Sequence, residues 1–150
     1  RIGVSLAKGL CYALDVPLIS IPSTEVLAQT FLNDRKLDET DIICSTIDAR
    51  RMEVYTNTYN SLGKALSNIE AKIVESDFMS EFSNQKVFFI GDSVQKIADI
   101  VEHSNFEAIK LFPSSIGLEK VAFEKFKQND FEDVAYFEPY YLKEFMAGKP

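Results

Sequence analysis

The residues best suited to chemistry gather in one short segment, from Asp48 to Arg51. Asp48 supplies a carboxylate, and Arg50 and Arg51 supply guanidinium groups, which hydrogen-bond phosphates and carboxylates through two parallel N–H groups. The segment therefore has two possible roles. It binds an anionic group, or Asp48 pairs with an arginine and closes a turn, a pairing worth under about 1 kcal/mol at an exposed site. We favour the turn-closing interpretation.

A second candidate is the segment Gly91-Asp92-Ser93, which follows an apolar stretch and precedes a helical pattern. Backbone amides at the start of a helix can bind an anion. The chain contains neither G-x-x-x-x-G-K-[ST] nor G-x-G-x-x-G, the spacings of phosphate-binding loops. A single glycine is weak support, so an ordinary strand-to-helix turn is the favoured interpretation.

Metal and nucleophile chemistry is restricted by one histidine, His103. Any metal site with two histidines is excluded, and a catalytic triad would have to use the same residue. His103 lies at the end of a predicted helix, where we expect it to hydrogen-bond the last carbonyls. Cys11 and Cys44 fall in apolar patterns and are expected to be buried, inert thiols. The residues by themselves predict no catalytic group, no metal and no cofactor.

Composition limits the class of protein. The 150 residues carry a formal net charge of −7, and tight direct binding of tRNA or DNA by this chain alone is not expected, because phosphate neutralisation supplies most of that affinity. The 46% hydrophobic share is enough to fill a core. Two cysteines and no Asn-x-Ser/Thr acceptor favour a reducing, cytoplasmic setting. No stretch is long and uncharged enough to predict a membrane span.

The elements that must position these residues begin with a helix over residues 2–14. Ile2 and Leu6 start a row of apolar residues four positions apart. The helix carries one charge, Lys8, so it is expected to lie inside the fold or beneath a partner. It lacks a capping residue upstream, which predicts that more chain precedes Arg1 in the complete protein.

The rest of the chain alternates strand and helix patterns. Strands are predicted at residues 16–21, 41–48, 51–59, 69–75, 86–90 and 106–111. Helices are predicted from 22–25 onward, with Ser23 as the cap, and over 77–82, 94–102 and 116–128. The second and third strands form a hairpin, and Ala49-Arg50 is a poor pair for a two-residue turn, so a longer tip is expected. This order predicts an α/β domain with a mixed sheet and flanking helices.

Five segments, in consistent order, resemble the TsaB (YeaZ) family. They are Arg1-Ile-Gly-Val-Ser-Leu-Ala-Lys-Gly-Leu10, Pro17-Leu-Ile-Ser-Ile-Pro-Ser-Thr-Glu25, Asp48-Ala-Arg-Arg-Met-Glu-Val-Tyr55, Phe89-Ile-Gly-Asp92 and Glu138-Pro-Tyr-Tyr-Leu-Lys-Glu-Phe145. The third is the most specific, because the family signature reads Asp-Ala-Arg-Arg-x-Glu-Val-Tyr. Its polar and aromatic positions here have no assigned role; they are Asp48, Arg50, Arg51, Glu53 and Tyr55.

The resemblance implies the C-terminal part of a two-lobed actin-like/sugar-kinase (RNase H-like) fold. Residues 1–35 would be a remnant of the N-terminal lobe, and residues 36–150 the C-terminal lobe. It also implies a non-catalytic scaffold or dimerisation subunit of the machinery that puts a threonylcarbamoyl group on the adenosine beside the tRNA anticodon. The implied partners are a TsaD-like transferase, which carries the metal, a TsaE-like ATPase reached through the complex, and a second copy of the chain. Contact with tRNA would be indirect, and none with a membrane is expected.

The same resemblance implies that the first helix contacts the partner. The candidate interface positions are Arg1, Ile2, Val4, Ser5, Lys8 and Gly9. The alternative function is a nucleotide-binding ATPase or kinase-like enzyme of the same superfamily, which would need a nucleotide near Gly91 and Asp92. A peptidase is disfavoured, because the solitary His103 leaves no metal site.

Overall fold

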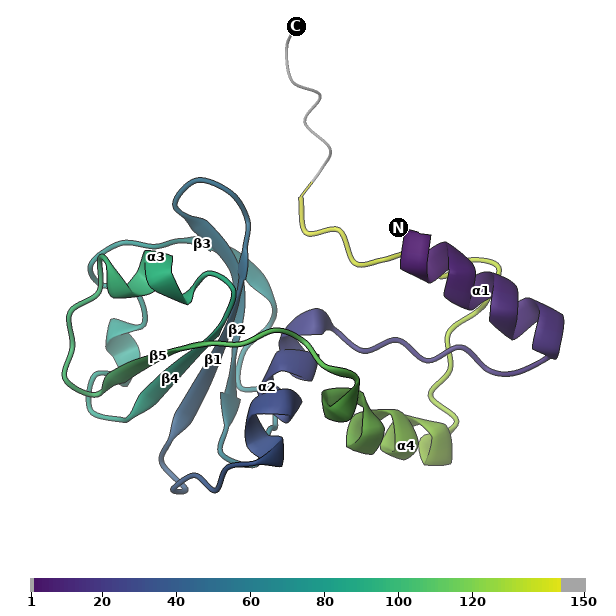
Figure 1. The fold of residues 1–150 in the computed structure, drawn as a ribbon, viewed down its shortest axis with the longest axis horizontal. Helices are drawn as coiled ribbons and strands as arrows, with labels where there is room; N and C mark the ends of the chain where they lie inside the picture. Colours follow the sequence, from purple (N-terminus) through teal and green to yellow (C-terminus); the bar gives the residue numbers. More distant parts are fainter. Residues whose placement is uncertain (1, 144–150) are drawn as a thin grey trace, which may run out of the picture. The chain divides into compact units, whose positions relative to one another are not determined.

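The computed structural model describes residues 2–143, which fall into two compact units. One unit comprises residues 2–20 and 122–143, and the other comprises Ile21–Val121 (Figure 1). The family resemblance implied a boundary between two lobes near residue 35, and this lobe boundary stays a prediction. No helix among residues 2–143 combines the length and apolar character that crossing a membrane requires.

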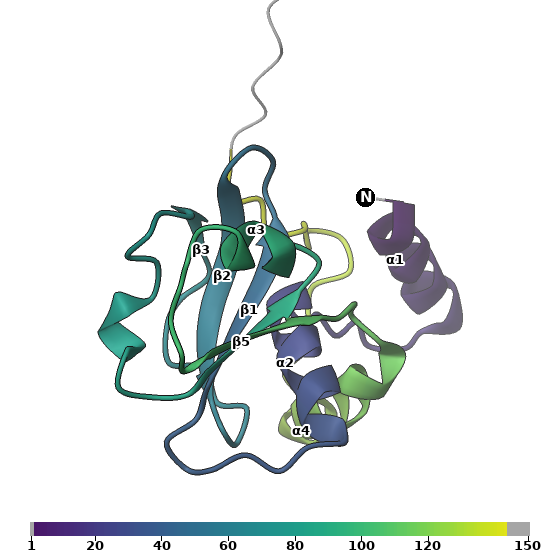
Figure 2. The ribbon, with the colours of Figure 1, turned by 60° about the vertical axis from the view of Figure 1, so that its left-hand side comes forward.

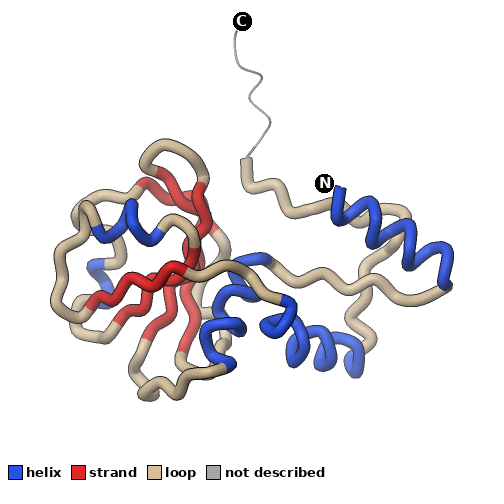
Figure 3. Tube along the Cα trace, in the orientation of Figure 1, coloured by secondary structure: helices blue, strands red, loops and turns tan. Residues whose placement is uncertain are grey.

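A five-stranded mixed sheet forms the centre of the Ile21–Val121 unit (Figure 3). Its strands are β1 (Ile42–Asp48), β2 (Glu53–Asn60), β3 (Glu70–Ile73), β4 (Val87–Gly91) and β5 (Phe106–Lys110), in the order β3-β2-β1-β4-β5. The β1–β2 and β2–β3 pairs are antiparallel, whereas the β1–β4 and β4–β5 pairs are parallel. The predicted mixed-sheet α/β class is confirmed.

Both faces of the sheet are covered, which explains why its central strands read as continuous apolar runs. On one face lies α2 (Ser23–Asn33), beside the sheet in Figure 2. Its Leu27 and Phe31 pack in one cluster with Ile43 of β1. On the other face, α3 (Val94–Ala98) and residues 74–82 cover Cys44 and the adjoining apolar side chains. Burying a side chain the size of leucine or phenylalanine contributes about 1.5–3 kcal/mol. These two layers hold the ends of β1 and β4 in fixed positions.

Three predicted helices differ from the structure. Residues 77–82 form only the short 3-10 helix η1 (Ser80–Phe82), because Met79 has a φ of +61° and left-handed backbone does not continue a right-handed helix. The helix predicted over 94–102 ends at Ala98. The last helix begins as the 3-10 helix η2 (Ser115–Leu118) and continues as α4 (Glu119–Gln128).

The cap predicted for the second helix is wrong. Ser23 is the first residue of α2 and not its cap; Pro22 holds that position and makes no side-chain cap. The serine that precedes η2 is a true cap, because Ser114 Oγ accepts a hydrogen bond from the backbone N–H of Ile116. The ring of Pro22 fixes φ at a value that suits the start of a helix, and proline has no backbone N–H that needs a partner. Helix α2 therefore starts without a polar side chain at its cap position.

The unit formed by residues 2–20 and 122–143 contains the predicted first helix, α1 (Ile2–Leu14). The strand predicted at residues 16–21 is wrong: the segment makes one isolated bridge, in which Glu132 N donates to Leu18 O at 2.8 Å. Ser20 Oγ also hydrogen-bonds Glu132 Oε1. A strand needs a continuous ladder of main-chain bonds, and a single bridge does not provide one. Among the described residues of this unit, Leu18 is the one buried hydrophobic side chain.

Candidate functional site

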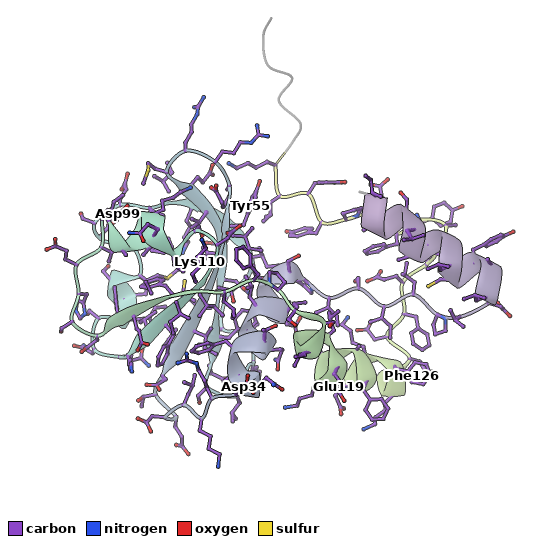
Figure 4. The ribbon with its side chains drawn as sticks, viewed as in Figure 1. Asp34, Tyr55, Asp99, Lys110, Glu119 and Phe126 are labelled. Atoms are coloured by element: carbon purple, nitrogen blue, oxygen red, sulfur yellow. The ribbon has the colours of Figure 1, made fainter. Side chains whose placement is uncertain are left out.

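The structure divides the signature segment between the two faces of the sheet and the tip of the β1–β2 hairpin. Side chains alternate along a strand. Asp48 stands opposite Val54, so it lies on the face that α3 covers. Glu53 and Tyr55 belong to the other face of β2. Figure 4 shows Tyr55 near the end of the sheet from which the β1–β2 connection projects.

Asp48 is the centre of a polar network that joins three segments. Lys96 Nζ, from α3, lies 2.6 Å from Asp48 Oδ1, and the backbone N–H of Arg50 donates to the same oxygen at 2.8 Å. The backbone N–H of Asp48 donates to Asp92 Oδ1 at 3.0 Å. The side-chain bond from Lys96, followed by the backbone bond from Arg50, lowers the pKa of Asp48. Asp48 therefore closes the tip, as we expected, but its ionic partner is Lys96 and not an arginine.

The ion pair of Asp48 gives a testable pH dependence. Since the folded-state pKa of Asp48 is lowered, its contribution to stability is complete above the unfolded value of about 3.9 and is lost as the pH falls below it. Asp48→Asn should therefore reduce the free energy of unfolding by under about 1 kcal/mol at pH 7, because the pair is exposed. Urea unfolding at pH 7 and pH 3 checks this. A difference between variant and wild type that grows toward pH 3 would contradict it.

The tip itself has four residues, 49–52, which confirms that it is longer than a two-residue turn. Arg50 and Arg51 both have positive φ angles, +70° and +50°, in the left-handed region that glycine and asparagine prefer. Both arginines are exposed. Within residues 2–143, neither guanidinium lies within ion-pair distance of a carboxylate. We call this pair the arginine tip.

The Gly91-Asp92-Ser93 segment is the predicted strand-to-helix turn: β4 ends at Gly91 and α3 begins at Val94. Because β1 and β4 are parallel neighbours, their carboxyl ends meet at one edge, which brings Asp92 to Asp48. Ser93 is buried, and its hydroxyl has no hydrogen-bond partner among the described residues. It does not cap α3.

The thiols and the histidine do not join this network. Cys44 is buried as predicted, and burial raises its pKa to about 12, so the thiol stays protonated at neutral pH. Cys11 is only half-buried, contrary to expectation, and its Sγ contacts Pro17 O at 3.6 Å. His103 lies beyond the shortened α3; its Nδ1 accepts from Asn105 N at 3.2 Å, so the expected contact with helix carbonyls is wrong. Among residues 2–143, no three His, Cys, Asp or Glu side chains are grouped for a metal ion.

Helix α1 presents two different faces. Its inner face is half-buried and consists of Val4, Ala7, Lys8 and Cys11. Its outer face is exposed and consists of Ile2, Ser5, Leu6, Gly9 and Ala13. Within each set, the residues follow the three- and four-residue spacing of one face of a helix.

The expected interface positions divide between these faces. Ile2, Ser5 and Gly9 come together on the outer face, whereas Val4 and Lys8 belong to the inner one. Lys8 Nζ donates to the tail carbonyls of Ala135 and Phe137, at 3.2 and 2.8 Å. Arg1 lies outside the described residues, as does the end of the tail motif. The interface assignment stays a prediction, and it now concerns the outer face.

Comparison with known proteins agrees with this architecture. A family model described as TsaD, tRNA N6-adenosine threonylcarbamoyltransferase, matches residues 1–147. The tRNA threonylcarbamoyladenosine biosynthesis protein TsaB of Bacillus subtilis (strain 168) is 32% identical over 114 residues. The chain belongs to the TsaB/YeaZ family. The TsaB alignment covers 71% of this chain and 48% of the relative, so the chain spans about half the length of that relative.

Two solved structures show the fold of this family. One is YeaZ from Pseudomonas aeruginosa, and the other is an uncharacterized protein with similarity to peptidase YEAZ from that organism. Their TM-scores are 0.74 and 0.76, and each is 20% identical to this chain. Each match covers 95% of this chain and 67% of the solved chain. The fold is therefore of the actin-like, RNase H-like type.

Proposed function

We propose that this chain is a non-catalytic subunit of the cytoplasmic machinery that forms threonylcarbamoyladenosine in tRNA. It acts by presenting the outer face of α1 to a TsaD-like transferase. The observation that supports this is the exposure of that face: Ile2 is 88% and Leu6 is 63% exposed. Contiguous apolar surface of this kind on a helix favours a partner, because burying it is worth about 25 cal/mol per Å².

The small residues of the outer face favour a partner that comes close. A Cβ added at Gly9 would meet no heavy atom within 4 Å, so the backbone at this point is open. Packed helices lie about 8–10 Å apart, with the lower values where the contacting side chains are small. Ser5, one helical turn before Gly9, is another small residue on the same face. This shape suits a second helix laid across α1.

The proposal extends to the further partners that the family resemblance implies. A second copy of the chain would use the outer face of α1 and would therefore compete with the transferase for it. A TsaE-like ATPase would join through the assembled complex. The tRNA would be held mainly by the other subunits, because this chain carries a net charge of −7.

The test combines binding with activity. The full-length protein and the TsaD-like transferase of the same organism are mixed and separated by size-exclusion chromatography. The assembled complex is then supplied with unmodified tRNA, and threonylcarbamoyladenosine is measured by mass spectrometry. We expect a stable complex and a modified tRNA that depends on this subunit. The proposal would be refuted if no complex forms and if tRNA is modified equally well without this subunit.

One observation favours a second candidate, a nucleotide-binding enzyme. Ser93, in the turn after β4, is buried with an unpartnered hydroxyl, and ligands of open α/β sheets bind at the carboxyl ends of parallel strands. Calorimetry with ATP and magnesium distinguishes the two. Micromolar binding and turnover by the isolated protein would replace the scaffold proposal, whereas no heat of binding would leave it standing.

A further inference from the structure

We propose that the arginine tip binds phosphate groups of the tRNA backbone within the complex, a direct contact where the family resemblance implied an indirect one. The inference rests on the proposed function. The two guanidinium groups are exposed and have no ionic partner among residues 2–143. Guanidinium groups donate paired hydrogen bonds to phosphate oxygens. Two adjacent arginines can therefore hold one or two phosphates of a nucleic acid chain.

The backbone of the tip supports a binding role over a purely structural one. Arg50 and Arg51 both occupy left-handed conformations. Residues other than glycine or asparagine adopt such conformations at a cost, and unfavourable backbone of this kind concentrates at functional sites. If the tip only had to reverse the chain, Asn and Gly would do so more favourably. The arginines thus occupy positions where folding alone favours other residues.

The surroundings keep the tip in one arrangement and leave its charges available. Asp48, two positions before Arg50, is paired with Lys96 and accepts the N–H of Arg50. Lys96 also donates to the carbonyl of Glu53, at 3.2 Å, so both ends of the tip are joined to α3. Asp92 accepts from the backbone of Asp48 at the base of the tip. A site that is already ordered loses less entropy when a ligand binds.

The position of the tip favours an extended polyanion over a small ligand. The β1–β2 connection projects beyond the sheet and α3 in two views (Figures 1 and 2). A small-molecule site normally encloses most of its ligand. A cavity of about 100 Å³ lies elsewhere, between β2, β3 and η1, and its lining includes Thr56, Ser67 and Phe82. A projecting pair of arginines can reach the outside of an RNA chain, which presents its phosphates outward.

The test replaces the arginines with the residues that the backbone prefers. The variant Arg50→Asn with Arg51→Gly removes both charges and should fold at least as stably as the wild type, measured by urea unfolding. In the complex of the full-length protein with its transferase, we expect tRNA affinity to fall about tenfold. The slope of log affinity against log salt should become shallower by about 1.5, because two phosphate contacts are lost.

A matched control changes the same charge elsewhere. Lys36 precedes β1 and Lys64 follows β2, at the end of the hairpin opposite the tip, where Ile42 pairs with Asn60. Lys36→Gln with Lys64→Gln also removes two positive charges, and we expect it to alter tRNA affinity less than twofold. Equal losses in both double variants would overturn the inference, since the effect would then be one of net charge.

The remaining outcomes separate this inference from the proposed function. If the complex that contains the tip variant binds and modifies tRNA like the wild-type complex, the inference fails and the scaffold proposal stands. The tip variant could instead lose binding of ATP or ADP while tRNA binding stays intact, or it could fail to form the complex with the transferase. Either result would assign the tip to another ligand and would also overturn the inference. If the wild-type protein does not join the transferase at all, the proposed function fails, and the inference fails with it.

Discussion

Gly91→Ala is expected to lower the free energy of unfolding by at least about 3 kcal/mol. Gly91 has a φ of +134°, which side chains of L-residues rarely adopt. A Cβ at this position would overlap the carbonyl oxygen of Thr46 and lie 2.9 Å from its carbonyl carbon. Both atoms belong to the backbone of the neighbouring strand, so no flexible side chain can move away. The parallel pairing of β1 and β4 would have to separate at this end.

The control is the same substitution where space is free. Gly3→Ala adds a Cβ that meets no heavy atom within 4 Å, in a helix, where alanine is favoured over glycine by about 1 kcal/mol. Urea unfolding followed by circular dichroism compares the two variants with the wild type. A Gly91→Ala protein that unfolds within about 1 kcal/mol of the wild type would show that the end of β4 adjusts, contrary to our expectation.

The position of Gly91 has a consequence for the polar network. The residue that follows it, Asp92, accepts a hydrogen bond from the backbone of Asp48. Any shift of β4 away from β1 would therefore open the base of the hairpin tip, where Lys96 pairs with Asp48. The Gly91→Ala variant should lose the pH dependence attributed to that pair together with its stability. The glycine thus connects the packing of the sheet with the candidate site.

The sheet could be predicted from the sequence because its strands have strong local patterns. The hairpin of β1 and β2 and the buried strand β4 consist of β-branched and aromatic residues bounded by polar turns. The longer hairpin tip was also predictable, since Ala49-Arg50 does not suit a two-residue turn. Such signals lie within a few residues of one another and need no knowledge of tertiary contacts.

Elements that depend on distant contacts were predicted less well. Residues 16–21 have the composition of a buried strand, but the described chain offers them one bridge, to Glu132. Residues 77–82 have a helical composition, yet Met79 takes a left-handed conformation and is itself buried against the sheet. In both cases the pattern of residue types was compatible with several structures, and tertiary packing selected another one.

The candidate site was predicted in part. The spacing of Asp48, Arg50 and Arg51 identified the tip, and the resemblance to the family added Glu53 and Tyr55. Lys96 was missed, although it is the ionic partner of Asp48. It lies 48 positions away in the chain, and the two meet only because β1 and β4 are parallel neighbours. The sequence offered one signal that could have located this partner. The turn after β4 lies at the carboxyl ends of the parallel strands, which is the edge of the sheet where β1 also ends.

Gly9→Gln is expected to weaken the complex with the transferase by about 10-fold to 100-fold without destabilising the chain itself. Space around Gly9 is open in this chain, since an added Cβ meets no heavy atom within 4 Å. Glutamine is also a better helix former than glycine, so the free energy of unfolding should rise by about 0.5 kcal/mol. A helix packed closely across the outer face of α1 would meet the new side chain and be pushed away.

The comparison with Gly3→Gln makes this result specific. Gly3 lies on the same helix, is equally open and is about 120° around the axis from Gly9, away from the stripe that contains Ile2 and Ser5. Affinity for the transferase is measured by calorimetry for both variants of the full-length protein. Equal affinities would show that the partner does not use the outer face. A loss confined to Gly9→Gln, in a protein that is more stable than the wild type, cannot come from unfolding and assigns the contact to that stripe.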